Sequence, residues 1–328
     1  MTHDLARRVR ALLRRPVPGV YLNSAAEGLP LDSAGVAYER YLDAKSRGSS
    51  GRAIFDEIED DARRSFAALL RVPPNDVGFV ASTSRGLDAV VKSIEWLPGD
   101  SIVLPSTEFP TALFAARLLA SRGVVVRSVG VAADGTLDEA NLVAAVDETT
   151  RLVVASVVSF RTGQLLDTRA LVARAHEVGA LEITHAPYVG YRGVVDLFPV
   201  HPATEESYSD ARRYQEGLPD YAALAVLHAS LEQLAPLRDE IVHHNRAVTA
   251  ILRDGLLALG ASVLAPGAPR GSLVAFETPR FAEITSALAD ADVTVWARDG
   301  RVRMSAHAYT TEDDAATALR VLDTIGAT

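Results

Sequence analysis

The chain has 328 residues, 48% hydrophobic and 23% charged, a composition typical of a soluble globular protein with room for one large and one small domain. The formal net charge of −9, without a basic run interleaved with aromatic residues, argues against a nucleic-acid partner. The chain contains no cysteine, which excludes thiol catalysis, cysteine-ligated metal and disulfides.

The arginine-rich residues 2–19 come first and are interpreted as an opening helix. They lack the long apolar core and the small-residue cleavage site of a secretory signal. Because no run of eighteen apolar residues occurs in the sequence, no membrane span is expected either. We therefore expect a cytoplasmic protein without a membrane partner.

Strand and helix periods alternate from about residue 50 onward. A helix with one apolar face is expected at 52–70, and its acidic run is interpreted as a solvated face. Strands are expected at 78–82, 101–105, 124–131, 151–159 and 180–184, and helices at 83–97, 108–123, 138–146 and 167–179. This alternation predicts an α/β fold with a mostly parallel, doubly wound sheet.

The alternation fails at 195–220, which is polar, rich in proline and predicted to be a long loop or linker. Beyond it the sequence predicts helices at 221–234, 239–260, 281–292 and 312–325, and strand-like segments at 261–267, 271–279, 293–300 and 301–307. These short units suit a small α/β domain with an antiparallel sheet. The expected division is an N-terminal segment that packs with the small domain, a large domain and a small domain, at 1–30, 31–236 and 237–328.

Polar or aromatic residues follow four of the expected strands, where ligands bind in open parallel sheets. Ser82, Thr83 and Ser84 precede a helix and could hold a phosphate, although on their own they are better explained as a simple helix cap. Phe109 could cover a flat ring or lie in the core. The loop 159–163 and His185 complete the set, and their convergence at one edge predicts a pocket without showing that it is used.

No metal site is expected. His243 and His244 are adjacent on a helix and so face different directions, which is poor spacing for metal ligands. The GxSxG, P-loop and GxGxxG patterns are also absent from the sequence.

The order of motifs resembles that of the class V aminotransferases, the branch with cysteine desulfurase-like, selenocysteine lyase-like and isopenicillin N epimerase-like proteins. The segments that carry the resemblance are YLNSAAEGLP, STSRGLDAVV, EFPTALF, SVVSFRTG, ARRYQEGLPDYAALAVLHASL and RVRMSAHAYTTEDD. They cover nearly the whole chain. The resemblance implies the type I fold of enzymes that depend on pyridoxal phosphate (PLP).

The resemblance also assigns roles to residues. Ser82, Thr83 and Ser84 correspond to the turn that binds the cofactor phosphate. Phe109 corresponds to the residue that stacks on the pyridine ring, and Thr162 lies in the loop near the ring hydroxyl. Substrate-binding positions are implied at Asn23, Arg213 and Arg303, of which Arg303 would meet the substrate carboxylate.

Two departures from the family put its chemistry in doubt. His185 and Tyr188 stand where the family has an aspartate that pairs with the pyridinium nitrogen and a glutamine, and a neutral histidine cannot supply a carboxylate's charge. The segment 195–220 replaces the one that carries the Schiff-base lysine. It contains no lysine, and the two lysines of the chain, Lys45 and Lys92, match no family motif.

Three hypotheses remain open, and the sequence favours the first. It is a pseudoenzyme that binds no cofactor, or binds PLP or another phosphate ligand non-covalently, as a homodimer or as the partner of an intact paralogue. The second is a PLP-independent enzyme acting on a small carboxylate or phosphate-bearing substrate through His185, Tyr188 and Arg303. The third, an active PLP-dependent lyase or aminotransferase, would need an unrecognised lysine.

The replaced segment also predicts a smaller sheet, reduced by a deletion. Loss of neighbouring strands should expose an edge or unpair part of the core. Either the flanking strands close the gap or a partner chain covers it.

Overall fold

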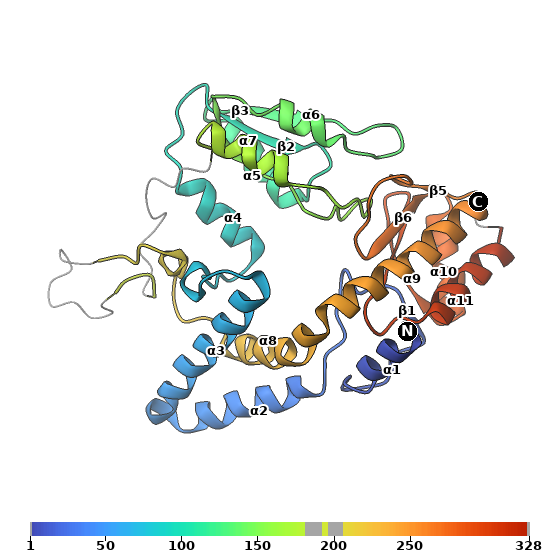
Figure 1. Ribbon diagram of the computed structural model, residues 1–328, viewed down its shortest axis with the longest axis horizontal. Coiled ribbons are helices and arrows are strands. Elements are labelled where there is room, and N and C mark those ends of the chain that lie inside the picture. The colour runs from blue at the N-terminus through green and yellow to red at the C-terminus, as the bar shows by residue number, and fades with distance from the viewer. Residues whose placement is uncertain (1, 181–191, 196–205, 327–328) are drawn as a thin grey trace.

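The computed structural model describes residues 2–180, 192–195 and 206–326 of the protein. It is an α/β structure in which three groups of elements lie apart, as Figure 1 shows: a parallel sheet with its helices, a set of long helices, and a C-terminal sheet with its own helices. The predicted fold class is confirmed. The predicted strand at 180–184 lies largely outside the described residues.

The parallel sheet has the order β3-β2-β4, with β2 (Ser101–Pro105) at its centre. Its other strands are β3 (Val125–Val129) and β4 (Thr150–Val153), and its helices are α4 (Thr83–Lys92), α5 (Pro110–Ala120), α6 (Glu139–Ala144) and α7 (Arg169–Glu177). Ile102 and Leu104 of β2 pack in one cluster with residues of α4 and α5, while Val103 packs in another with residues of α6 and α7. Both faces of the sheet are therefore covered by helices, as in doubly wound folds.

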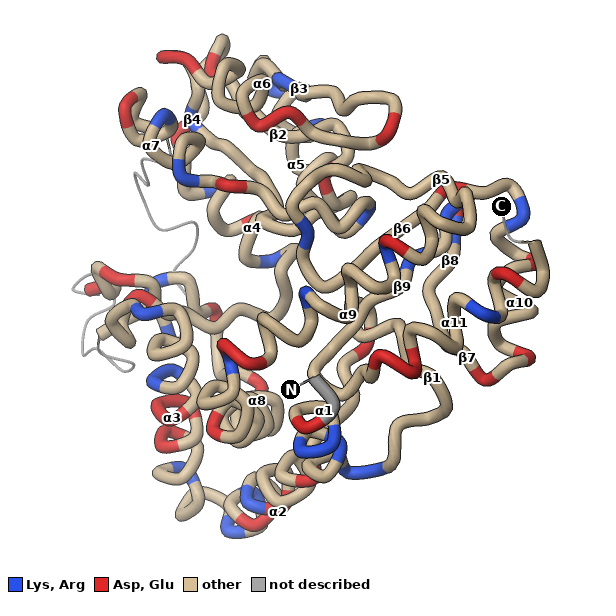
Figure 2. Tube along the Cα trace, turned by 45° about the vertical axis from the view of Figure 1, so that its right-hand side comes forward, with Lys and Arg blue, Asp and Glu red and all other residues tan. Residues whose placement is uncertain are grey.

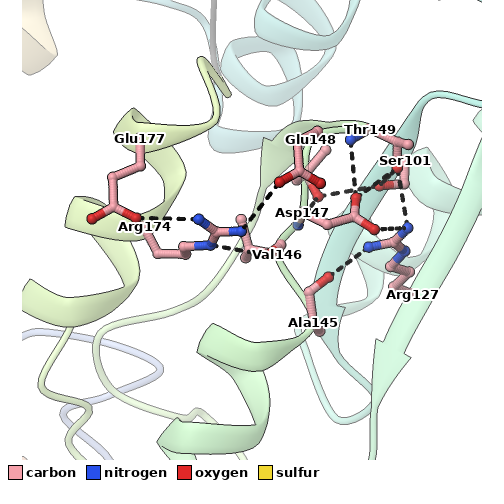
Figure 3. A network of polar contacts seen from close by, with 10 residues as sticks. Ser101, Arg127, Ala145, Val146, Asp147, Glu148, Thr149, Arg174 and Glu177 are labelled. Atoms are coloured by element: carbon pink, nitrogen blue, oxygen red, sulfur yellow. Dashed lines mark hydrogen bonds and ion pairs between the residues drawn. The ribbon is translucent and has the colours of Figure 1, made fainter.

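A network of polar contacts connects the loop between α6 and β4 to β3 and α7 (Figure 3). Arg127 of β3 pairs with Asp147 at 2.6 Å and donates to the carbonyl of Ala145 at 2.9 Å. Arg174 of α7 donates to the carbonyl of Val146 at 3.2 Å and pairs with Glu177. Hydrogen bonds from Arg127 and the Thr149 side chain hold the pKa of Asp147 well below its ordinary value. The loop is therefore held from both sides by charged hydrogen bonds.

The strand predicted at 78–82 does not form. Gly78 lies against the short helix η4 (Ala211–Tyr214), so closely that a Cβ on it would stand 2.3 Å from the carbonyl oxygen of Ala211. Arg63 donates to the carbonyl of Val77 at 2.7 Å. The short helix η4 thus lies against the start of this segment, and no strand among the described residues pairs with it. The strand predicted at 151–159 is also shorter than expected and ends at Val153.

The long helices α2 (Ser33–Ser46), α3 (Arg52–Leu70) and α8 (Tyr221–Leu234) pack together, and α3 confirms the helix predicted at 52–70. Acidic and basic residues are interspersed along α2 and α3 (Figure 2). The acidic run is not wholly a solvated face, because Glu59 and Arg63 are 2% and 6% exposed. The two side chains pair four residues apart, inside the structure rather than on its surface.

The C-terminal sheet is antiparallel and has the order β5-β6-β9-β8. Its strands are β5 (Ser262–Val263), β6 (Leu273–Glu277), β8 (Trp296–Arg298) and β9 (Arg301–Ser305), and the helices beside it are α9 (Arg238–Ala258), α10 (Phe281–Asp290) and α11 (Glu312–Thr324). The antiparallel sheet predicted for this region is confirmed. Its core contains Leu252, Phe276 and Leu288, which are almost completely buried.

The N-terminal segment lies against this C-terminal sheet (Figure 1). It contains α1 (Thr2–Arg10) and β1 (Val20–Tyr21), and β1 pairs in parallel with β7 (Val293–Thr294). The backbone of Ser305 donates to the carbonyl of Leu22 at 2.8 Å. The exact domain boundaries at 30, 236 and 237 stay a prediction.

The described part of the segment predicted as a linker has some structure. Val195 donates a backbone hydrogen bond to Glu206 at 2.8 Å, and η4 follows a few residues later. Among the described residues, no helix is long and apolar enough to cross a membrane.

The buried ion pair of α3 yields a test of stability. Arg63 donates to Gln215 at 3.0 Å, and Gln215 donates to Glu59 at 2.9 Å. Arg63→Met should lower the free energy of unfolding by about 3 kcal/mol, because it leaves buried acceptors without their donor. Urea unfolding followed by circular dichroism measures the change. In the control Arg64→Met, an exposed ion pair with Asp61 is lost, and the change should stay within about 0.5 kcal/mol. Equal losses would contradict a special role for the buried pair.

Candidate functional site

A cavity of about 790 Å³ opens at the carboxyl ends of β2 and β4. Its walls come from the start of α4, from the loop that follows β2 and from the residues that follow β4. Predicted residues that line it are Ser82, Thr83, Ser84 and Phe109. Three of the four predicted strand-end segments thus contribute to one cavity. They are the turn 82–84, the loop with Phe109, and the loop 159–163, which contributes Phe160. The fourth, with His185 and Tyr188, lies outside the described residues.

The start of α4 forms the polar wall of the cavity. Ser82 caps the helix, because its Oγ accepts from the backbone N–H of Arg85 at 3.2 Å. The Ser84 and Thr111 hydroxyls are 3.1 Å apart. The first N–H groups of a helix have no acceptor within it, and the helix dipole adds partial positive charge there. The cap interpretation therefore holds for Ser82, and the same turn is suited to an anion.

An aromatic wall faces this turn. Phe109 is 52% exposed, which rules out the alternative that it is a buried core residue. It packs edge-on against the Phe160 ring, with centroids 5.1 Å apart and an interplanar angle of 72°. The flat face of an aromatic ligand could stack on such an exposed ring.

Glu108 joins the loop after β2 to the loop after β4, and the sequence did not predict this role. Its buried carboxylate accepts from the backbone N–H groups of Phe109 and Ser156, both at 2.7 Å, and from the Ser156 hydroxyl at 2.6 Å. The loops after β2 and β4 thereby meet at one side chain. The available signal was a glutamate placed directly between a buried strand and a helix that begins with proline.

Thr162 lies behind the cavity rather than in its wall. It is 2% exposed, its Oγ1 accepts from the backbone of Gln164 at 3.2 Å, and its carbonyl accepts from Arg270 at 2.8 Å. The next residue, Gly163, has φ +80° and lies against the Leu273 carbonyl, so closely that a Cβ would clash with it. The loop 159–163 is thus packed onto the C-terminal sheet.

The three predicted substrate-binding residues occupy different places. Arg303 reaches the rear of the cavity wall, where it donates to the Phe160 carbonyl at 3.2 Å, and burial lowers its pKa. Asn23 is bridged to the backbone of Ser305, and its buried Oδ1 has no hydrogen-bond partner among the described residues. Arg213 lies in η4 and does not line the cavity.

The two lysines lie elsewhere. Lys92 ends α4, nine residues or roughly 14 Å along the axis from Thr83, and its Nζ pairs with Asp88 at 2.8 Å. Lys45 is in α2, with its Nζ 5.9 Å from the centroid of the Phe55 ring. Neither lines the cavity.

The sequence comparison gives the family to which this α/β fold belongs. The family model described as aminotransferase class-V matches residues 20–186, about half of the chain. The chain belongs to the class-V aminotransferase family.

The individual relatives described next share a third of their residues or fewer with this chain over the matched segments. A probable cysteine desulfurase of Methanothermobacter thermautotrophicus is 29% identical over 53% of this chain and 46% of its own length. The cysteine desulfurase of Dickeya dadantii is 33% identical over 58% of this chain and 50% of its own length. In both cases the chain spans about half the length of the relative. For the cysteine desulfurase of Pectobacterium atrosepticum the identity is 25%, over 82% of this chain and 81% of that protein.

Solved structures share the fold over almost the whole chain. The cysteine desulfurase of Thermococcus onnurineus has a TM-score of 0.85 at 18% identity and covers 97% of both chains. A mutant of a cystine C–S lyase, with glycine covalently linked to its PLP cofactor, has a TM-score of 0.83 at 20% identity and covers 96% of this chain and 99% of its own. These likenesses establish the type I fold.

The role of Glu108 can be tested by its removal. Glu108→Ala leaves the Phe109 N–H and both donors of Ser156 without an acceptor, and the free energy of unfolding should fall by about 3 kcal/mol. Urea unfolding measures the loss. The exposed Glu95 of the same region provides the control, because Glu95→Ala should change stability by no more than about 0.5 kcal/mol. A Glu108→Ala protein as stable as the control would show that the two loops do not depend on this carboxylate.

Proposed function

We propose that this protein binds a phosphate-bearing ligand, PLP included, without covalent attachment, and that it acts as a pseudoenzyme in which Schiff-base catalysis has been lost. The observation that carries the proposal is a cavity with the start of α4 on one side and an aromatic wall on the other, and with no lysine in its lining. From 180 to 221, the region that includes the segment replacing the lysine-bearing one, the sequence also has no lysine.

The described residues fit the phosphate and the ring of PLP, but they do not fit its covalent link. The N–H groups at the start of α4, with the hydroxyls of Thr83 and Ser84, would hold the phosphate. The exposed face of Phe109 would support the ring. When PLP is bound, its pyridine ring supplies an electron sink. Glu108 fixes the position of Phe109, and Arg303, behind Phe160, holds positive charge next to the site.

Covalent attachment would need one of two lysines that have other contacts. Lys92 forms an ion pair at the far end of α4, and Lys45 lies near an aromatic ring of the helical group. Either side chain would have to leave its contact and cross to another part of the fold. This geometry supports non-covalent binding.

Cysteine desulfurase activity is the alternative that the names of the relatives favour. In this chain the activity would depend on Lys45 or Lys92, and neither of them lines the cavity. The PLP-independent alternative rests on His185 and Tyr188, which lie outside the described residues, and only Arg303 supports it.

We also propose a second copy of this chain, or an intact paralogue, as the partner. Large apolar side chains stand exposed close to the cavity: Phe114 and Leu118, one turn apart on α5, are 66% and 52% exposed. Burying such side chains against another chain would be favourable. The cytoplasmic location expected from the sequence stays a prediction.

A PLP titration tests the proposal. The protein should show a saturable change in PLP absorbance that dialysis reverses, and borohydride treatment followed by mass spectrometry should leave the protein mass unchanged. Stoichiometric mass gain at one lysine would show that covalent attachment has survived. Lys45→Arg and Lys92→Arg variants would then identify the residue.

The phosphate turn is tested separately. Ser84→Ala should weaken PLP binding about tenfold, because one hydrogen bond to a charged phosphate is lost. Ser121→Ala, which removes an exposed serine hydroxyl at the end of α5, should leave PLP binding unchanged. Equal PLP affinities in the two variants would show that the phosphate does not bind at the start of α4.

A further inference from the structure

Two buried arginines lie side by side on one face of β9. Arg301 and Arg303 are two residues apart, so their side chains project from the same face of the strand. They are 5% and 7% exposed. Both guanidinium groups lie over the indole ring of Trp296 on β8, with the Cζ of Arg301 at 5.7 Å and that of Arg303 at 4.8 Å from the ring centroid.

Neither arginine has a carboxylate partner in the part of the chain that the structure describes. Arg303 makes one hydrogen bond, to the Phe160 carbonyl, and the side chain of Arg301 makes none to a described residue. The Nε atoms of both are enclosed and have no acceptor there. Cation–π contact with Trp296 compensates little of the cost of taking two charged groups out of water.

Arg270 is a buried arginine with a structural role, and its hydrogen bonds provide a comparison. Its terminal nitrogens donate to the carbonyls of Thr162, Leu264 and Ala265 at 2.6 to 3.1 Å. Arg270 thereby joins the loop 159–163 to the end of β5. Arg301 has no such carbonyl partners, so an equivalent structural role does not account for it.

A third arginine adds positive charge at the same place. Arg161, in the loop 159–163, lies 3.5 Å from Glu277, the residue that faces Arg301 across the β6–β9 pair. Burial, and then the charge of Arg161, lower the pKa of Arg301.

The local charges do not balance. Glu277 faces Arg301 and pairs with Arg161, whereas the pKa of Arg303 is lowered by burial without a contribution from any carboxylate. Asp299, whose charge also raises the pKa of Arg301, pairs with the exposed Arg298 at 3.5 Å. Among the described residues, the cluster of Arg161, Arg301 and Arg303 therefore keeps an excess of two positive charges.

We propose that this arginine cluster binds a small dicarboxylate, with one carboxylate at Arg303, beside the Phe160 wall of the cavity, and the second between Arg301 and Arg161. The excess of two positive charges matches a ligand with two negative ones. Guanidinium groups bind carboxylates with two parallel hydrogen bonds. Because Arg301 and Arg303 are two residues apart on β9, roughly 6.6 Å along the strand, they suit two separated carboxylates better than a single compact anion.

The inference extends the proposed function by naming the class of a second ligand, and it rests on that proposal only for the position of Arg303 beside the cavity. The dicarboxylate would enter beside the wall that Phe109 and Phe160 form. It would supply acceptors to two buried cations whose Nε atoms have no acceptor among the described residues.

Trp296 provides a direct readout. The chain has two tryptophans, and Trp96, whose Nε1 donates to the Val91 carbonyl, lies in the other sheet's core cluster. In a Trp96→Phe background, succinate should produce a saturable change in fluorescence. Acetate and inorganic phosphate should need at least tenfold higher concentrations for the same change.

Substitutions then assign the binding groups. In that background, Arg301→Gln and Arg161→Gln should each raise the half-saturating concentration of succinate about tenfold or more and bring it close to that of acetate. Arg298→Gln, in the same hairpin but 75% exposed, is the matched control and should leave the value unchanged. Without ligand, Arg301→Gln should melt at a higher temperature, because a buried unpaired charge is removed.

The inference is overturned if succinate gives no saturable signal, if acetate or phosphate binds as well as succinate, or if Arg301→Gln and Arg161→Gln bind it normally. Arg161 is exposed enough that its variant folds independently of any effect at Arg301. Ser84→Ala should not change succinate binding, so failure at the phosphate turn and failure at the arginine cluster are separable.

Discussion

The carboxylate of Glu108 joins two strand ends on which the cavity depends. Parallel strands present their carboxyl ends at one edge, but the chain leaves that edge in separate loops that nothing in the sheet itself holds together. Glu108 accepts three hydrogen bonds from Phe109 and Ser156 and so fixes the loops after β2 and β4 relative to each other. The Phe109 ring is thereby held opposite the start of α4, which gives the cavity one aromatic and one polar wall.

Phe160 connects this cavity to the C-terminal sheet. Its ring packs on Phe109, and its carbonyl accepts from Arg303, so one residue belongs to both the aromatic wall and the arginine cluster. Gly163 allows the same loop to lie directly on β6. The loop 159–163 therefore lies between the helix start that forms the polar wall and the arginine cluster on the antiparallel sheet.

Much of the fold could be predicted from the sequence, because local periodicity determines elements such as α3 and β2. The segment 78–82 shows where that reasoning fails. Its apolar character suits a strand, but a strand needs a neighbour, and here η4 rather than a described strand lies against the start of the segment. The site was predicted in part: the turn at 82–84 and Phe109 line the cavity, Thr162 lies behind it, and Glu108 was missed. Glu59 and Arg63 were missed as well, since charge in a helix usually indicates a solvated face.

The sequence by itself determined the order of the elements, the family, and the absence of a lysine between 180 and 221, since each of these depends on residue identity and local order. Only the tertiary structure decided which charges are compensated. Arg303 and Phe160 are 143 positions apart, and whether an arginine finds a carboxylate depends on contacts between such distant segments. The sequence has 42 acidic residues for its 33 basic ones, yet the fold leaves Arg301 and Arg303 buried beside an indole without a carboxylate among the described residues.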